Sequence, residues 1–261
     1  MPPDGAAFGL AVAWPAPANV RAVMSTRGGG VSRGAYATLN LGAQVGDDAG
    51  AVAKNRQCFE QTLGARACWL HQVHGRSVVN AAAFVDGPPP QADASWTDQP
   101  GIVCVVQAAD CLPILFAASN GRAVGAAHAG WRGLAAGVAQ ATLEAVAAAA
   151  ACPAREVLVW LGPCIGPAQF EVGVEVRDAY FGDERFFVPR PDPRALPNAH
   201  PDGRPRWLAD LAGLARQQLD RAGAVAISGG SWCTVSEPSR FFSFRRDGVT
   251  GRLGAAVCLV G

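Results

Sequence analysis

The chain has 261 residues, half of them hydrophobic, and its 22 basic and 21 acidic side chains leave a formal net charge of +1. A near-neutral chain lacks the basic surface that binds duplex nucleic acid or an anionic membrane, so neither partner is expected. The longest apolar runs, such as residues 145–151, are far shorter than the ~20 residues of a membrane-spanning helix, and no secretory signal is expected at the amino-terminal end.

The spacing of the cysteines predicts a cytoplasmic protein, and the lack of repeats and linkers predicts a single domain. The eight cysteines are irregularly spaced, which is not the pattern of a disulfide framework, and a reducing compartment is therefore expected. No internal repeat or low-complexity linker divides the chain. We expect a single domain over residues 1–261 that exists as a monomer.

Apolar periodicity predicts interleaved helices and strands. Asp47 and Asp48 can cap a helix that places Val52, Phe59 and Leu63 on one face. Apolar runs predict strands over residues 103–106, 112–116, 122–127, 157–161 and 254–260, and helical spacing predicts helices over residues 134–150, 172–181 and 208–222. Residues 189–205 are rich in proline and are expected to be irregular. This alternation predicts a layered α/β (α+β) fold with mixed β-sheets flanked by helices.

Two donor side chains lie where predicted strands end. His128 follows an apolar run and is followed by Gly130, and glycine lets a ligand approach the backbone closely. Cys111 follows Asp110 at the break between two predicted strands. A thiolate at Cys111 can bind zinc, or it can act as a nucleophile with a histidine as its base. The residues alone leave both interpretations open.

A third donor comes from residues 71–75. His71 and His74 are three apart in a segment whose neighbours favour a strand or turn, where the two rings face opposite sides. The adjacent Gly75 makes His74 the better candidate. His74, Cys111 and His128 form a set of two imidazoles and one thiol, which suits Zn²⁺ with an open fourth position.

Two arginine-bearing loops are candidates for binding an anion. Arg27 precedes three glycines, and Arg245 follows the phenylalanine-rich residues 241–244. A guanidinium suits phosphate, and neighbouring aromatic rings can stack on a base. The alternative is a solvated arginine pair over a hydrophobic cluster.

An ordered series of motifs covers nearly the whole chain: residues 25–32, 39–42, 55–56, 72–75, 92–94, 109–113, 128–133, 162–166, 170–173, 242–247 and 250–252. With these motifs the chain resembles the YfiH-type family, also called the laccase-domain or multicopper polyphenol oxidase family. That family is regarded mainly as zinc-dependent purine nucleoside phosphorylases.

The resemblance implies His74, Cys111 and His128 as metal ligands and catalytic residues, with His71 outside the ligand set. It implies a fold related to a deamidating toxin that uses a Cys/His pair. The implied activities are phosphorolysis of adenosine, inosine, guanosine and methylthioadenosine, and deamination of adenosine. Phosphate and a purine nucleoside would then be the partners. Arg27, Asn40 and Arg245 are the expected substrate-binding residues.

Two other enzyme classes and a binding module remain as alternatives. A copper polyphenol oxidase, with copper in place of zinc, is disfavoured because multicopper oxidases need more histidines than the four present. A metal-free amidase acting on peptidoglycan precursors would use Cys111 as its nucleophile. A binding module would bind nucleoside without turnover.

Overall fold

The computed structural model describes residues 9–181, 183–190 and 205–261. Its strands are β1 (Gly9–Leu10), β2 (Val20–Ser25), β3 (Arg66–Cys68), β4 (Val78–Asn80), β5 (Ala94–Thr97), β6 (Ile102–Ala108), β7 (Leu112–Ala118), β8 (Val124–Ala129), β9 (Val157–Leu161), β10 (Glu171–Val172), β11 (Phe187–Pro189), β12 (Trp207–Ala209), β13 (Ala226–Gly229) and β14 (Leu253–Leu259). Its α-helices are α1 (Ala49–Leu63), α2 (Trp131–Ala135), α3 (Val138–Ala150), α4 (Val174–Asp178), α5 (Leu211–Arg221) and α6 (Phe244–Asp247).

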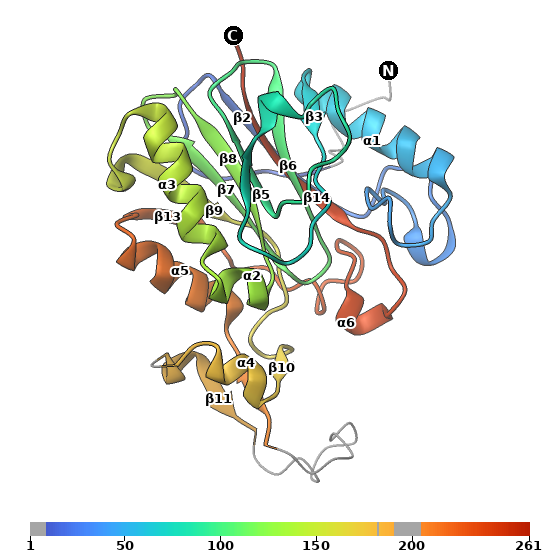
Figure 1. The fold of residues 1–261 in the computed structure, drawn as a ribbon. Coiled ribbons are helices and arrows are strands. Elements are labelled where there is room, and N and C mark those ends of the chain that lie inside the picture. Colours follow the sequence, from blue (N-terminus) through green and yellow to red (C-terminus); the bar gives the residue numbers. More distant parts are fainter. Residues whose placement is uncertain (1–8, 182, 191–204) are drawn as a thin grey trace.

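Among these residues the strands form three sheets. One has the order β1-β2-β14-β6-β3, the second has the order β13-β9-β7-β8-β5-β4, and a small third sheet has the order β10-β12-β11. Parallel pairs, such as β3 with β6 and β4 with β5, occur beside antiparallel pairs, such as β7 with β8. The small sheet and α4 lie apart from the two larger sheets (Figure 1).

Alternating residues explain why the central strands are apolar throughout. Ile114 and Phe116 of β7 pack in the cluster that contains α3 and α5, whereas Leu115 packs between the two larger sheets. In β6, Val105 packs in the cluster beneath α1, and Cys104 packs between the sheets. Successive side chains of a strand point to opposite faces, and here both faces are buried.

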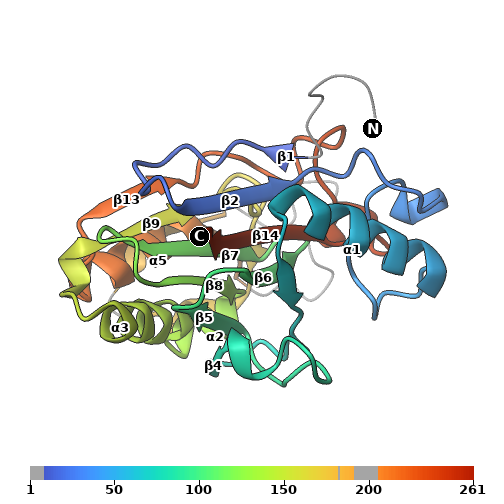
Figure 2. The same ribbon diagram turned by 90° about the horizontal axis from the view of Figure 1, so that it is seen from above.

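The helices flank the sheets in the way that this packing requires. Helices α3 and α5 lie side by side against the second sheet, as Figure 1 shows. Helix α1 packs on the first sheet, and Figure 2 shows α1 and α3 on opposite flanks of the strands. The predicted layered fold with mixed sheets and flanking helices is therefore confirmed.

Several predicted elements are confirmed within a few residues. Asp48 caps α1 by accepting a hydrogen bond from the amide of Ala51. The helix ends at Gly64, whose φ of 65° lies in the left-handed region that favours glycine. The five predicted strands correspond to β6, β7, β8, β9 and β14. The irregular excursion predicted over residues 189–205 falls almost entirely on residues 191–204, which lie outside the described part of the chain.

Three predicted helices differ from the structure. The helix expected over residues 134–150 is divided into α2 and α3, because Gly137 has a φ of 91° that no continuing helix adopts. Of the helix expected over residues 172–181, only the half that forms α4 is helical, since Gly173 separates β10 from α4. The helix expected from residue 208 begins later, because residues 207–209 form β12 and Asp210 caps α5.

Candidate metal centre

Two of the three candidate ligands lie where the chain passes from one large sheet to the other. His74 lies between β3 of the first sheet and β4 of the second, and Cys111 lies between β6 of the first sheet and β7 of the second. His128 is near the end of β8, where it pairs with Pro113 of β7. The register of β7 with β8 therefore brings residues 111 and 128 together, and the crossing at residues 69–77 adds His74.

The backbone is left-handed at His74, with a φ of 60°, and at Asp110, with a φ of 91°. Conformations of this kind in residues other than glycine cost of order 1–3 kcal/mol each and persist when the surroundings fix them. The Asp110 carboxylate accepts hydrogen bonds from the Thr234 hydroxyl at 2.6 Å and from the Arg245 amide at 2.6 Å. These bonds hold the turn that presents Cys111.

Asp93 fixes the other two candidate ligands. Its buried carboxylate lies 2.9 Å from Nδ1 of His128 and accepts hydrogen bonds from the amides of Val73, His74 and Gly75 at 3.2, 2.9 and 2.6 Å. One carboxylate thus holds both the loop of His74 and the ring of His128. Because Nδ1 of His128 faces Asp93, Nε2 is left for a metal, and this is the usual arrangement behind a histidine ligand.

The three donor atoms converge. Sγ of Cys111 lies 3.9 Å from Nε2 of His74, and the donor atoms of all three residues lie within 4.8 Å of one another. The rings of His74 and His128 meet edge to face, with centroids 4.8 Å apart. The structure therefore brings together the three residues that the sequence singled out.

The electrostatics of the cluster favour a thiolate. Burial raises the pKa of the Cys111 thiol, but the charge of His128 and hydrogen bonds from both histidines outweigh burial and lower this pKa to about 6. Burial lowers the pKa of His128, and the charge of Cys111 together with the hydrogen bond to Asp93 raises it to about 9. Burial likewise opposes ionisation of Asp93, yet its hydrogen bonds to His128 and Gly75 lower its pKa.

These residues fit a metal ion by their donor chemistry. Zinc binds imidazole nitrogen at about 2.0–2.1 Å and thiolate sulfur at about 2.3 Å, and three protein ligands with one open position are typical of catalytic zinc. His128 is buried, Cys111 is half-buried and His74 is exposed, so the cluster is open on one side. An ion held by these ligands would face that open side.

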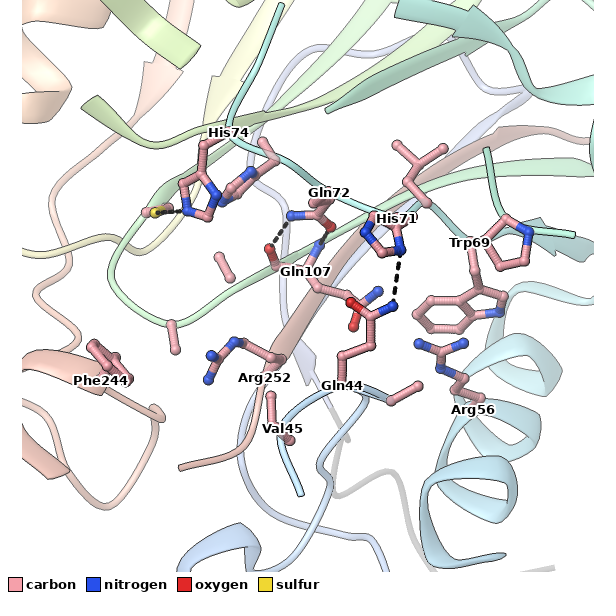
Figure 3. Close-up of a pocket in the computed structure, with 18 residues that line it drawn as sticks. Gln44, Val45, Arg56, Trp69, His71, Gln72, His74, Gln107, Phe244 and Arg252 are labelled. Carbon is pink, nitrogen blue, oxygen red and sulfur yellow. Dashed lines mark hydrogen bonds between the residues drawn. The ribbon is translucent and has the colours of Figure 1, made fainter. Parts of the chain in front are cut away.

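The open side is a cavity of about 530 Å³. It is lined by Gly42, Ala43, Gln44, Val45, Arg56, Trp69, Leu70, His71, Gln72, His74, Pro89, Gln107, Ala108, Ala109, Cys111, His128, Phe244 and Arg252. Figure 3 shows His74 at one end of the cavity and Trp69 with Arg56 at the other. We call these the metal end (His74, Cys111, His128) and the aromatic end (Gln44, Arg56, Trp69, His71).

The three predicted substrate-binding residues do not line this cavity. Arg27 donates hydrogen bonds to the carbonyls of Ala37 and Pro238, and Arg245 donates to the carbonyl of Glu171 at 3.0 Å. Asn40 is fully buried and accepts a hydrogen bond from the Arg252 amide. Substrate binding by Arg27, Asn40 and Arg245 stays a prediction. The hydrogen bonds of all three connect separate segments of the chain and stabilise the fold.

Sequence reasoning gave no role to Asp93, Arg56, Trp69 or Arg252. One signal was available for Asp93, which is flanked by Ala92 and Ala94. A carboxylate among small apolar residues is expected to be buried, and a buried carboxylate needs partners. Arg56 and Arg252 lie in the motifs at residues 55–56 and 250–252, but a motif does not show that distant segments meet in one cavity wall.

A family model described as multi-copper polyphenol oxidoreductase laccase matches residues 21–260. The chain belongs to this family. Among curated relatives, the chain is 48% identical over 248 residues to a purine nucleoside phosphorylase of Pseudomonas aeruginosa, covering 94% of this chain and 96% of that protein. It is 44% identical over 252 residues to the purine nucleoside phosphorylase YfiH of Escherichia coli, covering 95% and 97%.

Solved structures of similar proteins share the fold. A Neisseria meningitidis protein matches with a TM-score of 0.86 and 44% identity, covering 98% of this chain and 100% of that one. YlmD of Geobacillus stearothermophilus matches with a TM-score of 0.83 and 31% identity, covering 99% and 98%. Among the described residues, no helix is long and apolar enough to cross a membrane.

Proposed function

We propose that this protein is a zinc-dependent purine nucleoside phosphorylase that also deaminates adenosine. The observation that carries the proposal is the convergence of His74, Cys111 and His128 on one wall of a 530 Å³ cavity. A cavity of this size is typical of small-molecule sites. The names of relatives that match more than nine-tenths of the chain support phosphorolysis. The proposed substrates are phosphate with adenosine, inosine, guanosine or methylthioadenosine.

In phosphorolysis an oxygen of phosphate forms a bond to C1′ of the ribose while the bond from C1′ to the purine breaks. The purine keeps the bonding electron pair and takes up a proton, and ribose 1-phosphate is released. Bound zinc supplies a Lewis acid for this chemistry. His74, Cys111 and His128 would hold the ion, and Asp93 keeps the His128 ring in the orientation that leaves Nε2 free. The cavity positions the two reactants, which lowers the entropic part of the barrier.

The experiment that tests the proposal supplies zinc-loaded protein with adenosine and phosphate. Ribose 1-phosphate, adenine and inosine are followed together, so that phosphorolysis and deamination are separated in one assay. At early times, before inosine accumulates and is itself cleaved, we expect adenine and ribose 1-phosphate in equal amounts, with inosine as the product of deamination. Cys111→Ala and His128→Ala should lose zinc and phosphorolysis together. Turnover that persists in fully metal-free protein would contradict the proposal.

The contact between Cys111 and His74 supports a second candidate, a metal-free Cys/His amidase acting on peptidoglycan precursors. A thiol with a lowered pKa, 3.9 Å from an imidazole nitrogen, is the geometry of an activated nucleophile. A chelator separates the two candidates, because the amidase would keep its activity without metal and lose it on alkylation. Metal analysis in the same experiment decides between zinc and copper, since stoichiometric copper with oxygen uptake on phenols would favour the oxidase.

A further inference from the structure

The cavity wall is positively charged, and among the described residues no carboxylate lines it. Its ionisable lining residues are Arg56, Arg252, Cys111 and three histidines. The Asp93 carboxylate lies behind the metal end and is occupied by His128 and by three backbone amides. A cavity of this composition attracts an anion.

The two arginines of the cavity wall have different surroundings. Arg56, at the aromatic end, donates from Nε to the carbonyl of Leu41 at 2.9 Å, and its guanidinium lies 4.0 Å from the centre of the Trp69 ring. Its planar face is therefore already covered by an aromatic ring, where a cation is stabilised.

Arg252 differs from Arg56 in its place, because its guanidinium lies beside the Phe244 ring rather than against Trp69; within the described residues Nη1 and Nη2 of Arg56 form no hydrogen bond either. Nη1 of Arg252 donates to the carbonyls of Thr250 and Gly251, each at 3.1 Å. Within the described residues, no hydrogen bond is formed by its Nε or Nη2. A guanidinium has five N–H donors in a fixed fork, so Arg252 keeps donors for a ligand. Figure 3 shows its guanidinium pointing to the side of the cavity on which His74 and Phe244 lie.

The fold holds Arg252 rigidly in this place. Its amide donates to Oδ1 of the buried Asn40 at 2.8 Å. Its side chain crosses Gly42 so closely that a Cβ at position 42 would lie 2.6 Å from Cγ of Arg252. The Phe244 ring lies on its other side, with its centre 5.9 Å from the guanidinium carbon. Arg252 lines the same cavity as His74, Cys111 and His128.

We propose that Arg252 binds the phosphate co-substrate at the metal end of the cavity, through the free donors of its guanidinium. The inference rests on the proposed phosphorylase function and adds the residue that holds the anion. Arg27 and Arg245 are not needed for this role, because the donors that they use are directed at backbone carbonyls outside the cavity. Phosphate held here would lie beside the metal ligands, and the aromatic end would remain for the nucleoside.

The test measures binding of inorganic phosphate to zinc-loaded protein by calorimetry, without nucleoside and without turnover. Arg252→Gln should weaken phosphate binding roughly 10- to 100-fold, the range expected for loss of hydrogen bonds to a charged group. Arg252→Lys should fall between wild type and Arg252→Gln, since an ammonium keeps the charge but loses the fork. Arg155→Gln is the matched control, because it removes the same charge from an exposed position away from the cavity.

Kinetics then distinguish this inference from the proposed function. In Arg252→Gln the KM for phosphate should rise by the same factor, and the KM for nucleoside should stay within about threefold of wild type. Unchanged phosphate affinity in Arg252→Gln, or no phosphate binding by wild type at millimolar concentration, overturns the inference. Phosphate binding that depends on Arg252 in a protein without phosphorolysis overturns only the proposed function. If Arg252→Gln does not fold, Arg252→Lys decides by the same measurements.

Discussion

The two ends of the cavity use the same kinds of side chain in opposite ways. At the metal end, hydrogen bonds hold His74 and His128 from behind, and their remaining ring nitrogens face the Cys111 thiol. At the aromatic end, Gln44 is paired with Nδ1 of His71 at 2.9 Å, and Nε of Arg56 and Nε1 of Trp69 donate to Leu41 and Glu60. The difference teaches that the two histidines of the metal end are held by hydrogen bonds to Asp93, while among the described residues their remaining donor atoms contact only one another and Cys111.

The largest expected difference between the two ends is in the reactivity of their cysteine thiols. Burial raises the pKa of Cys68, which precedes Trp69 at the aromatic end, to about 11, whereas the pKa of Cys111 falls to about 6. At pH 7 the thiolate populations then differ by roughly 10⁴, and the weaker nucleophilicity of the less basic thiolate reduces the ratio of rates to about 100. Iodoacetamide should therefore modify Cys111 in metal-free protein long before Cys68.

The pH profile gives the sign of this effect. Because the pKa of Cys111 is lowered, its modification rate should rise through about pH 6 and level off near pH 7. An unperturbed thiol, with a pKa of about 8.5, would continue to gain rate up to about pH 9.5. Peptide mapping by mass spectrometry measures the rate at each cysteine, and added zinc should protect Cys111. A profile for Cys111 that still rises above pH 8 would remove the contrast between the two ends.

The next largest effect is expected from replacing the Asp93 carboxylate, which holds His74 and His128 at the metal end. Asp93→Asn should lower zinc affinity about 10- to 100-fold, the range seen when a group that orients a ligand is replaced. The asparagine NH₂ cannot accept the amide hydrogens of the 73–75 loop, so the free energy of unfolding should also fall by about 2 kcal/mol. Competition with a chromophoric chelator measures the affinity, and urea denaturation measures the stability. Zinc affinity equal to wild type would show that the two ligands do not depend on Asp93.

A smaller effect is expected from a methyl group placed against the side chains of Cys111 and His74, with the hydrogen bonds of Asp93 left unchanged. A Cβ at position 130 would lie 2.9 Å from Sγ of Cys111 and 3.0 Å from Cδ2 of His74. Both contacts are shorter than van der Waals distance, so Gly130→Ala should displace the two side chains and lower zinc affinity by about tenfold, within the loss expected for a misplaced ligand. Gly28→Ala is the control, since its nearest neighbour would be Oγ1 of Thr26 at 3.8 Å. Equal zinc affinity in both variants would mean that the donors tolerate the methyl group.

The sequence was sufficient to predict the three donors but not what supports them. His74, Cys111 and His128 lie beside glycines or at strand ends, and these are local signals that one sequence displays. Asp93 and Arg252 act through partners up to 212 residues away, as in the bond from the Arg252 amide to Asn40. The fold shows the same division. The long apolar strands β6 and β7 were predicted, whereas β5 was missed because its four residues include Ser95 and Thr97, and its place is set by pairing with β8.

The smallest effect is expected at the aromatic end, from His71→Ala. The Nδ1 atom of His71 lies 2.9 Å from the side-chain amide of Gln44, and His71 is not among the residues whose donor atoms converge. Its removal should leave one zinc ion bound, change turnover by less than about twofold and shift the nucleoside KM by only a few-fold, because one exposed neutral hydrogen bond contributes about 0.5–1.5 kcal/mol. His74→Ala is the matched variant, with the same substitution three residues along the chain. Metal analysis and initial rates compare the two, and loss of zinc from His71→Ala would mean that the coordinating imidazole is His71.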